Sequence, residues 1–217
     1  MTGSALMPLK ETMHAISAGM LIPTIAILLL FVAFMAIELG SLLVEVVTER
    51  RKVKVNVPAL LDAFQGKNSN EIMDEISNSH MFTRQKLALN EIIKHSHLPA
   101  VSHEALARQL LASEELHYAR ITNRTDLVAR LGPMLGLMAT LIPLGPGLIA
   151  LGQGDTKTLA DSLLTAFDAT VTGLAAAAIA FAISRLRKRW YEDYLSSLEA
   201  LMEGLLEAFA REKGIKE

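Results

Sequence analysis

Two long apolar segments joined by a short polar connection constrain this chain more than any other feature. They cover residues 126–152 and 162–187, and residues 153–161 connect them. Each segment supplies roughly the twenty apolar residues that an α-helix needs to cross about 30 Å of hydrocarbon. The pair therefore predicts a transmembrane hairpin, which the basic run at residues 185–189 closes.

The second segment of the hairpin carries a polar stripe. Its members are spaced four, three and four residues apart, and so share one face of a helix. They are Asp161, Thr165, Asp168 and Thr172. A carboxylate inside an apolar segment is costly unless it faces protein, water or a partner. The stripe therefore contains candidate ion-pathway residues, although its threonines could instead bond their own backbone carbonyls and only soften the helix.

Small residues line the opposite side of the same segment, where they form a ridge of the kind that lets membrane helices approach closely. They include Ala169, Gly173 and Ala177, with Gly136 as the packing residue of the first segment. Thr170 lies beside this ridge, roughly 160° around the helix from Asp168. We expect the two helices to pack along these small residues.

The first segment of the hairpin contains Pro133, Pro143 and Pro146. Proline removes a backbone donor and kinks a helix, and in lipid the freed carbonyls must be satisfied by neighbours or water. We therefore expect a broken helix around LIPLGPG, which fits a pore wall better than a lipid-facing anchor.

A further apolar run predicts the first transmembrane helix over residues 15–48, after an external interfacial segment at residues 1–14. Its uncharged part, residues 15–37, is too long for a signal peptide and should remain uncleaved. Glu38 and Glu45 follow and share a face. Glu38 is either hydrogen-bonded to a neighbouring helix or part of an ion route, and we expect Glu45 to snorkel to the membrane interface.

Basic residues set the predicted orientation. They cluster after the first span, before the second and after the third, whereas the 153–161 connection holds only Lys157. The positive-inside rule then puts the N-terminus and this connection outside, and the C-terminus in the cytoplasm. The cytoplasmic parts are a helical insert, residues 49–125, and an amphipathic helix, residues 188–217, whose apolar stripe should pack on helices of the insert. The predicted fold is all-α, with three transmembrane helices extended by long cytoplasmic helices.

Composition limits the other function classes. Hydrophobic residues make up 51% of the chain and the net charge is −2, so nothing argues for nucleic acid. The absence of cysteine excludes disulfides and thiolate chemistry. His95 and His97 diverge on a helix, and the HEALA run at His103 lacks the second histidine of a zinc-protease motif. We predict no metal, no cofactor and no enzymatic activity.

The hairpin resembles a known family. GPMLGLMATLIPLGPGL and AFDATVTGLAAAAIAF are similar to the paired pore helices of the MotA/TolQ/ExbB proton channel family, particularly its archaeal-type members, with the three-span topology of ExbB and TolQ. The resemblance implies a multi-pass protein of the cell (inner) membrane that forms a ring-shaped homo-oligomer, usually a pentamer. The ring would surround two copies of a single-span ExbD/TolR/MotB-like partner and act as a molecular motor that converts the proton motive force into rotation or force.

Two positions carry over from that family. Thr140 in GLMAT matches the pore threonine, with Ala139 in place of a glycine, and Thr170 matches the threonine ahead of the family's Gly-Leu pair. The transducer branch has a glutamate five residues before that second threonine, where this chain has Thr165. Either Asp168 substitutes for the glutamate, or the pore relies on the threonines and the partner's aspartate.

Two classes of function remain. The first is an ion-conducting subunit, for which the coupling ion could be the proton or sodium. The alternative is a non-conducting membrane scaffold subunit of an envelope complex, in which the same threonines and small residues only mediate helix packing.

Overall fold

The computed structural model describes residues 3–48, 56–64, 67, 69–79, 81–212 and 214, and in these ranges the chain is helical with no strand. The helices are α1 (Gly3–Gly19), α2 (Leu21–Thr48), α3 (Val57–Phe64), α4 (Ser69–Asn78), α5 (Thr83–Lys94), α6 (Ala100–Gly152) and α7 (Thr156–Glu212). Three stretches are long and apolar enough to cross a membrane: Pro8–Val47, Ala100–Gly152 and Thr156–Arg211. The prediction of an all-α chain with three spanning helices is thus confirmed. The predicted boundary between residues 48 and 49 falls at the end of a described range. The basic cluster at residues 50–54 lies outside the described residues.

The chain divides into two compact units, to which α2, α6 and α7 each contribute a part. Unit 1 comprises Met1–Ser41 and Asn123–Arg185, and unit 2 comprises Leu42–Thr122 and Leu186–Glu217. No helix end occurs near residue 125 or residue 187, where we predicted domain boundaries, because α6 and α7 run through both positions. These stretches contain no proline or glycine that would interrupt a helix.

A break at Met20 separates α1 from α2, and α1 ends at Gly19, five residues beyond the predicted boundary at residue 14. Pro23 has no N–H to bond the carbonyl of Gly19, the residue four positions earlier. The Met20 N–H lies 3.2 Å from the Ile16 oxygen and 3.1 Å from the Ser17 oxygen, and the Thr24 hydroxyl donates to the Met20 carbonyl at 2.7 Å. The glycine and the proline together end one helix and start the next.

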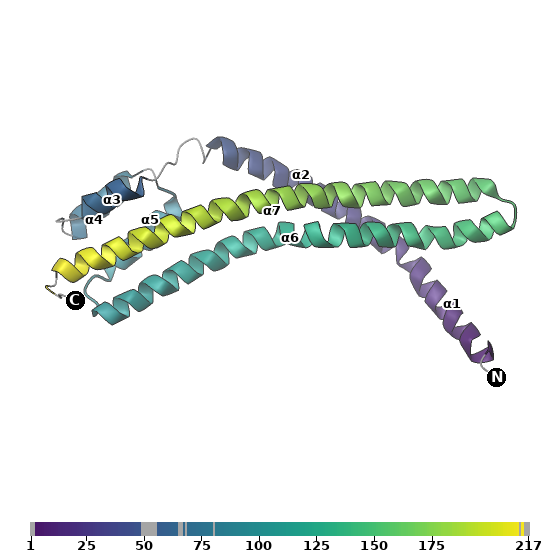
Figure 1. Cartoon of the computed structure of the whole chain (residues 1–217), viewed down its shortest axis with the longest axis horizontal. Helices are drawn as coiled ribbons and strands as arrows, with labels where there is room; N and C mark the ends of the chain where they lie inside the picture. The colour runs from purple at the N-terminus through teal and green to yellow at the C-terminus, as the bar shows by residue number, and fades with distance from the viewer. Residues whose placement is uncertain are drawn as a thin grey trace. The chain divides into compact units, whose positions relative to one another are not determined.

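In unit 1, α6 and α7 form an antiparallel hairpin (Figure 1). The turn between them contains Gly154, whose φ of 83° is a conformation that favours glycine. Asp155 caps the start of α7, because its carboxylate accepts the Thr158 N–H at 3.0 Å and the Thr158 hydroxyl at 2.5 Å. These hydrogen bonds hold the pKa of Asp155 below its usual value.

The prolines do not break α6, which is one helix from Ala100 to Gly152. The expected interruption around LIPLGPG is therefore wrong. What the prolines remove is the N–H donor for the carbonyls four residues earlier, those of Ala129, Ala139 and Ile142.

Unit 2 has a conventional apolar core built from α3, α4, α5 and the unit 2 parts of α6 and α7. Its buried members are Phe64, Ile72, Ile76, Met81, Ala88, Leu89, Ile92, Ile93, Ala107, Leu198, Leu201, Met202, Leu205 and Phe209. The apolar stripe of residues 188–217 thus packs on helices of the insert within one chain. At the edge of the core, Arg84 donates two hydrogen bonds to the Glu114 carboxylate, at 2.8 and 2.9 Å, and this bidentate ion pair raises the pKa of Arg84.

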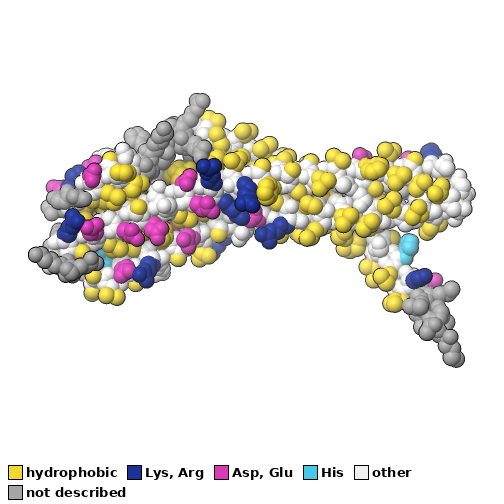
Figure 2. All heavy atoms as spheres, viewed as in Figure 1, with side chains coloured by type: hydrophobic (Ala, Val, Ile, Leu, Met, Phe, Trp, Pro, Cys, Tyr) yellow, Lys and Arg dark blue, Asp and Glu magenta, His cyan; other side chains and the backbone are white. Residues whose placement is uncertain are grey.

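The two units differ in surface chemistry. On the face in Figure 2, the unit 1 parts of α6 and α7 carry mainly hydrophobic and neutral side chains, whereas acidic side chains line α7 in unit 2. The acidic residues of that part of α7 include Glu192, Asp193, Glu199, Glu203 and Glu207, all of them exposed.

Candidate functional site

The seam between α6 and α7 in unit 1 is built around two glycines. A Cβ placed on Gly173 would lie 2.7 Å from the Gly132 carbonyl oxygen, and a Cβ on Gly132 would lie 2.8 Å from the Gly173 oxygen and 3.0 Å from the Ala177 Cβ. Any residue larger than glycine would collide with backbone at these positions. Gly136 adjoins the same contact, since a Cβ on Gly173 would lie 3.1 Å from the Gly136 Cα. The structure therefore brings Gly136, Gly173 and Ala177 together.

The two family-matched threonines lie along this same seam. A Cβ on Gly136 would lie 3.5 Å from the Thr170 Cα and 3.7 Å from the Ala169 carbonyl oxygen. Thr140 lies one helical turn beyond Gly136 on α6. Thr140 and Thr170 are both half-buried in the isolated chain. The two side chains thus lie at neighbouring levels of one helix pair.

Each of these threonine hydroxyls donates to its own helix. The Thr140 hydroxyl donates to the Leu137 carbonyl at 2.7 Å, and the Thr170 hydroxyl donates to the Ala166 carbonyl at 3.1 Å. A hydroxyl with its hydrogen committed in this way presents only oxygen lone pairs to its surroundings. Both oxygens are therefore oriented to accept a hydrogen bond from water or to coordinate a cation.

The polar stripe of α7 lies away from this seam. Asp161, Thr165 and Asp168 are exposed and Thr172 is half-buried, whereas Ala166 and Ala169 on the other side are buried. The Thr165 hydroxyl donates to the Asp161 carbonyl at 2.9 Å. Within one chain, the structure does not bring Asp168 next to Thr140, because the stripe and the seam occupy different sides of α7.

The surroundings of Asp168 are apolar. Phe167 and Val171 are 64% and 67% exposed, so the carboxylate lies on an otherwise hydrophobic surface. A carboxylate in that position would be costly in contact with lipid. A favourable environment for the Asp168 carboxylate therefore requires contact with protein or water beyond the single chain.

Glu38 lies on the packed face of α2. The buried residues of this helix, Thr24, Leu28, Met35 and Leu42, recur at spacings of four and seven. Leu28 packs on Ala139 and Ala169 of the hairpin. Glu38 follows Met35 by three residues and is half-buried, so its helix face is the one that packs in the bundle.

A buried ion pair in unit 2 was missed by the sequence analysis. The Arg187 guanidinium donates through Nε to Glu45 Oε2 at 3.2 Å, with the two side chains only 4% and 15% exposed. The expectation that Glu45 snorkels is wrong, because an arginine of α7 neutralises it inside the protein. Tyr191 is also buried there, and burial together with the Glu45 charge raises its pKa. The sequence signal for a buried charge was Arg187 itself, an arginine one turn before Tyr191 on the apolar stripe of α7.

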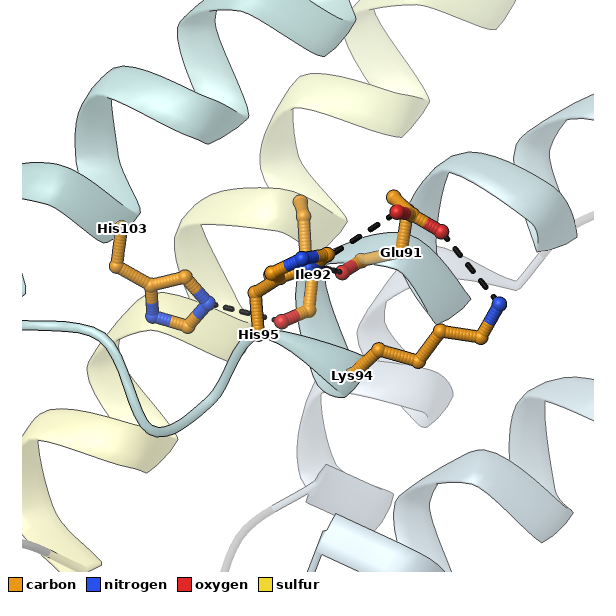
Figure 3. Close-up of polar contacts among 5 residues, drawn as sticks. All are labelled: Glu91, Ile92, Lys94, His95 and His103. Carbon is orange, nitrogen blue, oxygen red and sulfur yellow. Dashed lines mark hydrogen bonds and ion pairs between the residues drawn. The ribbon is translucent and has the colours of Figure 1, made fainter.

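Two histidines of unit 2, His95 and His103, bond to backbone carbonyls. His103 Nε2 lies 2.9 Å from the Ile92 carbonyl oxygen near the end of α5 (Figure 3). The His103 ring also stacks on the Phe209 ring. His95 Nδ1 lies 2.9 Å from the Glu91 carbonyl oxygen. Within the described ranges, no three His, Asp or Glu side chains are grouped so that they could hold a metal ion.

Comparison with known proteins gives one family. Residues 68–200, more than half of the chain, match the family model described as the MotA/TolQ/ExbB proton channel family. The match extends from the start of α4 into the unit 2 part of α7 and includes Thr140, Asp168 and Thr170. No curated protein matches the chain.

Proposed function

This chain belongs to the MotA/TolQ/ExbB proton channel family and is a multi-pass membrane protein, and from this premise we propose that it is an ion-conducting subunit of an energy-transducing complex. It assembles as a ring, in the family's usual pentamer, around two copies of a single-span ExbD/TolR/MotB-like partner. It lies in the cell (inner) membrane with its N-terminus outside and its C-terminus in the cytoplasm. The assembly converts an ion gradient into rotation or force.

One observation carries this proposal: an exposed carboxylate on an apolar helix surface. Asp168 and its stripe neighbours Asp161 and Thr165 are uncovered in the single chain, while exposed hydrophobic residues surround them. A membrane-embedded carboxylate faces protein or a water-filled cavity rather than lipid. A neighbouring copy, the partner or a hydrated pore therefore covers this side of α7, which is the arrangement of a conducting ring.

The threonines of the seam fit the other part of the pathway. Because the Thr140 and Thr170 hydroxyls donate to backbone carbonyls, their oxygens remain available to water or a cation. The carbonyl of Ala139, which has no helical N–H donor because of Pro143, is adjacent in sequence to Thr140. We assign the ion route to Thr140 and Thr170, with Asp168, Thr165 and Thr172 along it.

Two further carboxylates belong to the proposal as entry or exit groups. Asp161 precedes Asp168 by seven residues on the same stripe, near the turn that we expect to lie outside. Glu38 lies on the packed face of α2, so a route through it would run within the bundle. Moving one charge across the membrane is worth about 2.3 kcal/mol per 100 mV, which is the energy source of the complex.

The test is ion flux into liposomes that contain this chain with its single-span partner. Thr140→Val, Thr170→Val and Asp168→Asn should each lower flux in assembled complexes. Thr24→Val is the matched control, because the Thr24 hydroxyl also donates to the carbonyl four residues earlier, that of Met20, at 2.7 Å, outside the hairpin. Replacing protons by sodium as the driving gradient identifies the coupling ion.

A non-conducting scaffold is the alternative, and one observation favours it. The hydroxyls of Thr140, Thr165 and Thr170 are all bonded to their own helix, as they would be if they only softened or packed the helices. Absence of flux in a correctly assembled wild-type complex, together with normal assembly of Asp168→Asn, would establish the scaffold and reject conduction.

A further inference from the structure

The seam along which Thr140 and Thr170 lie is made mostly of small residues, which do little to fix the register of α6 against α7. Around the closest approach, α6 contributes Gly132 and Gly136, and α7 contributes Ala169, Gly173 and Ala177. Glycine and alanine give shallow surfaces, so the helices approach closely but no large side chain of one inserts between turns of the other. The short turn at residues 153–155 constrains the register at one end of the hairpin, so a tie at the far end would hold the helices in register along the seam between them.

A hydrogen bond between side chains crosses the same seam. The Ser184 hydroxyl on α7 donates to Asp126 Oδ1 on α6, and Ser184 is only 2% exposed. Both residues belong to unit 1. This bond joins the two helices directly, through a carboxylate acceptor that makes it stronger than a bond between neutral groups.

The position of this bond is related to that of the threonines. Asp126 precedes Thr140 by fourteen residues on α6, and Ser184 follows Thr170 by fourteen residues on α7. Fourteen residues are two heptads, so in packed helices each pair of positions lies on the same side of its helix. Because α6 and α7 are antiparallel, fourteen residues back along α6 and fourteen forward along α7 cover the same distance in the same direction. The Asp126–Ser184 pair therefore has the same register as the Thr140–Thr170 pair, about 21 Å away along the helices.

We propose that the Asp126–Ser184 hydrogen bond is the register lock of the hairpin, and that Asp126 is a positioning residue that keeps Thr140 and Thr170 at their neighbouring levels. The link to conduction rests on the function proposed above. A one-residue slip would move the two threonine oxygens apart along the helix axes by about 1.5 Å and rotate one of them by about 100°. A pair of oxygens set to face one ion or water would then no longer do so.

A direct role for Asp126 in carrying ions along the seam is disfavoured by the contact that lies between the two polar levels. Gly132 and Gly173 approach so closely that a Cβ on either would lie within 2.8 Å of the other's carbonyl oxygen. No water chain fits between helices that exclude a methyl group. Asp126 is therefore separated from the threonines by a dry contact.

The test measures register and flux separately. Because the chain contains no cysteine, single cysteines at exposed Leu137 and Val171 accept a pair of spin labels whose separation reports the α6–α7 register in the assembled complex. Ser184→Ala should shift or broaden this separation and lower flux. Asp126→Asn, which keeps a side-chain oxygen to accept the bond, should leave both close to wild type. Asn123→Leu on α6, an exposed polar residue one turn away, is the matched control and should change neither.

Exchange of the two residues gives the strictest test. The double variant Asp126→Ser with Ser184→Asp retains one donor and one acceptor across the seam, and should restore the separation and flux lost in Ser184→Ala. An unchanged separation in Ser184→Ala would overturn the register lock. Loss of flux in Asp126→Asn with an unchanged separation would show that the carboxylate itself carries ions. If the wild-type complex does not conduct, the proposed function fails, while the label separation still decides the register lock.

Discussion

The same two helices pack in opposite ways in the two units. In unit 1, α6 and α7 meet through Gly132 and Gly173, and buried positions of α7 such as Ala176 and Ala180 are small. In unit 2, the continuation of α7 buries large side chains, among them Leu198, Leu201 and Leu205, against α3, α4 and α5. The change occurs along single helices that no break interrupts.

The difference reflects the two solvents that the chain meets. Between helices in lipid there is no hydrophobic driving force, so small residues that allow close backbone contact supply the attraction. In water, the removal of large apolar side chains from solvent supplies it, at about 25 cal/mol per Å². Accordingly, large apolar residues of unit 1 such as Leu137 and Phe167 are exposed on the outside, where lipid surrounds them.

The largest effect should come from the large-residue core. Leu205 is fully buried in unit 2, so Leu205→Ala should cost about 2 to 5 kcal/mol of unfolding free energy through lost burial and the cavity left behind. The same change at Leu174 in unit 1, where the side chain is exposed, should cost much less in a bilayer or detergent. Thermal unfolding of the two purified variants, followed by circular dichroism, measures both. Equal losses would contradict the division into two packing modes.

The sequence predicted the elements that depend on long, regular patterns. The apolar runs identified all three spanning helices, and the 3.6-residue pattern after residue 188 identified the stripe that holds Leu198 and Leu205. The sequence failed at Glu45 and Arg187, because 142 residues separate the two charges and an arginine on the apolar stripe does not identify its partner.

Glycine and proline in α6 were the other source of error. Gly132 lies next to Pro133 in the segment that was expected to contain a break, yet it serves the close contact with Gly173 inside a continuous helix. Composition cannot distinguish a glycine that ends a helix from one that admits a neighbour, since both depend on the missing Cβ. The sequence proposes the candidate residues, among them Thr140, Asp168 and Thr170. Its division between the seam and the exposed side of α7 required the geometry of both helices.

A smaller effect should distinguish the seam from the core at the level of a single methyl group. Gly173→Ala places a Cβ 2.7 Å from the Gly132 carbonyl, and because backbone cannot rotate away, the helices must separate at a cost of about 1 to 3 kcal/mol. Gly204→Ala in unit 2 meets the Leu61 Cδ2, the end of a flexible side chain. Gly204→Ala should therefore cost less than Gly173→Ala, as measured by thermal unfolding. Gly40→Ala on α2, which has open space around it, is the control and should not destabilise.

The smallest expected effect is a pH dependence confined to unit 2. Burial and the neighbouring Glu45 charge raise the pKa of Tyr191 in the folded chain. Its contribution to stability is therefore fully present below the pKa of an unfolded tyrosine, about 10, and is lost as the pH rises above it. Ultraviolet titration of tyrosinate should show that one of the three tyrosines ionises at a higher pH than the others. Tyr191→Phe should remove that late component. The same variant should also lose less stability at alkaline pH than the wild type. A wild-type titration in which all three tyrosines ionise together near pH 10 would mean that Tyr191 is not enclosed with Glu45. The Arg187–Glu45 pair of unit 2 would then be open to solvent, which would weaken the contrast with the dry seam of unit 1.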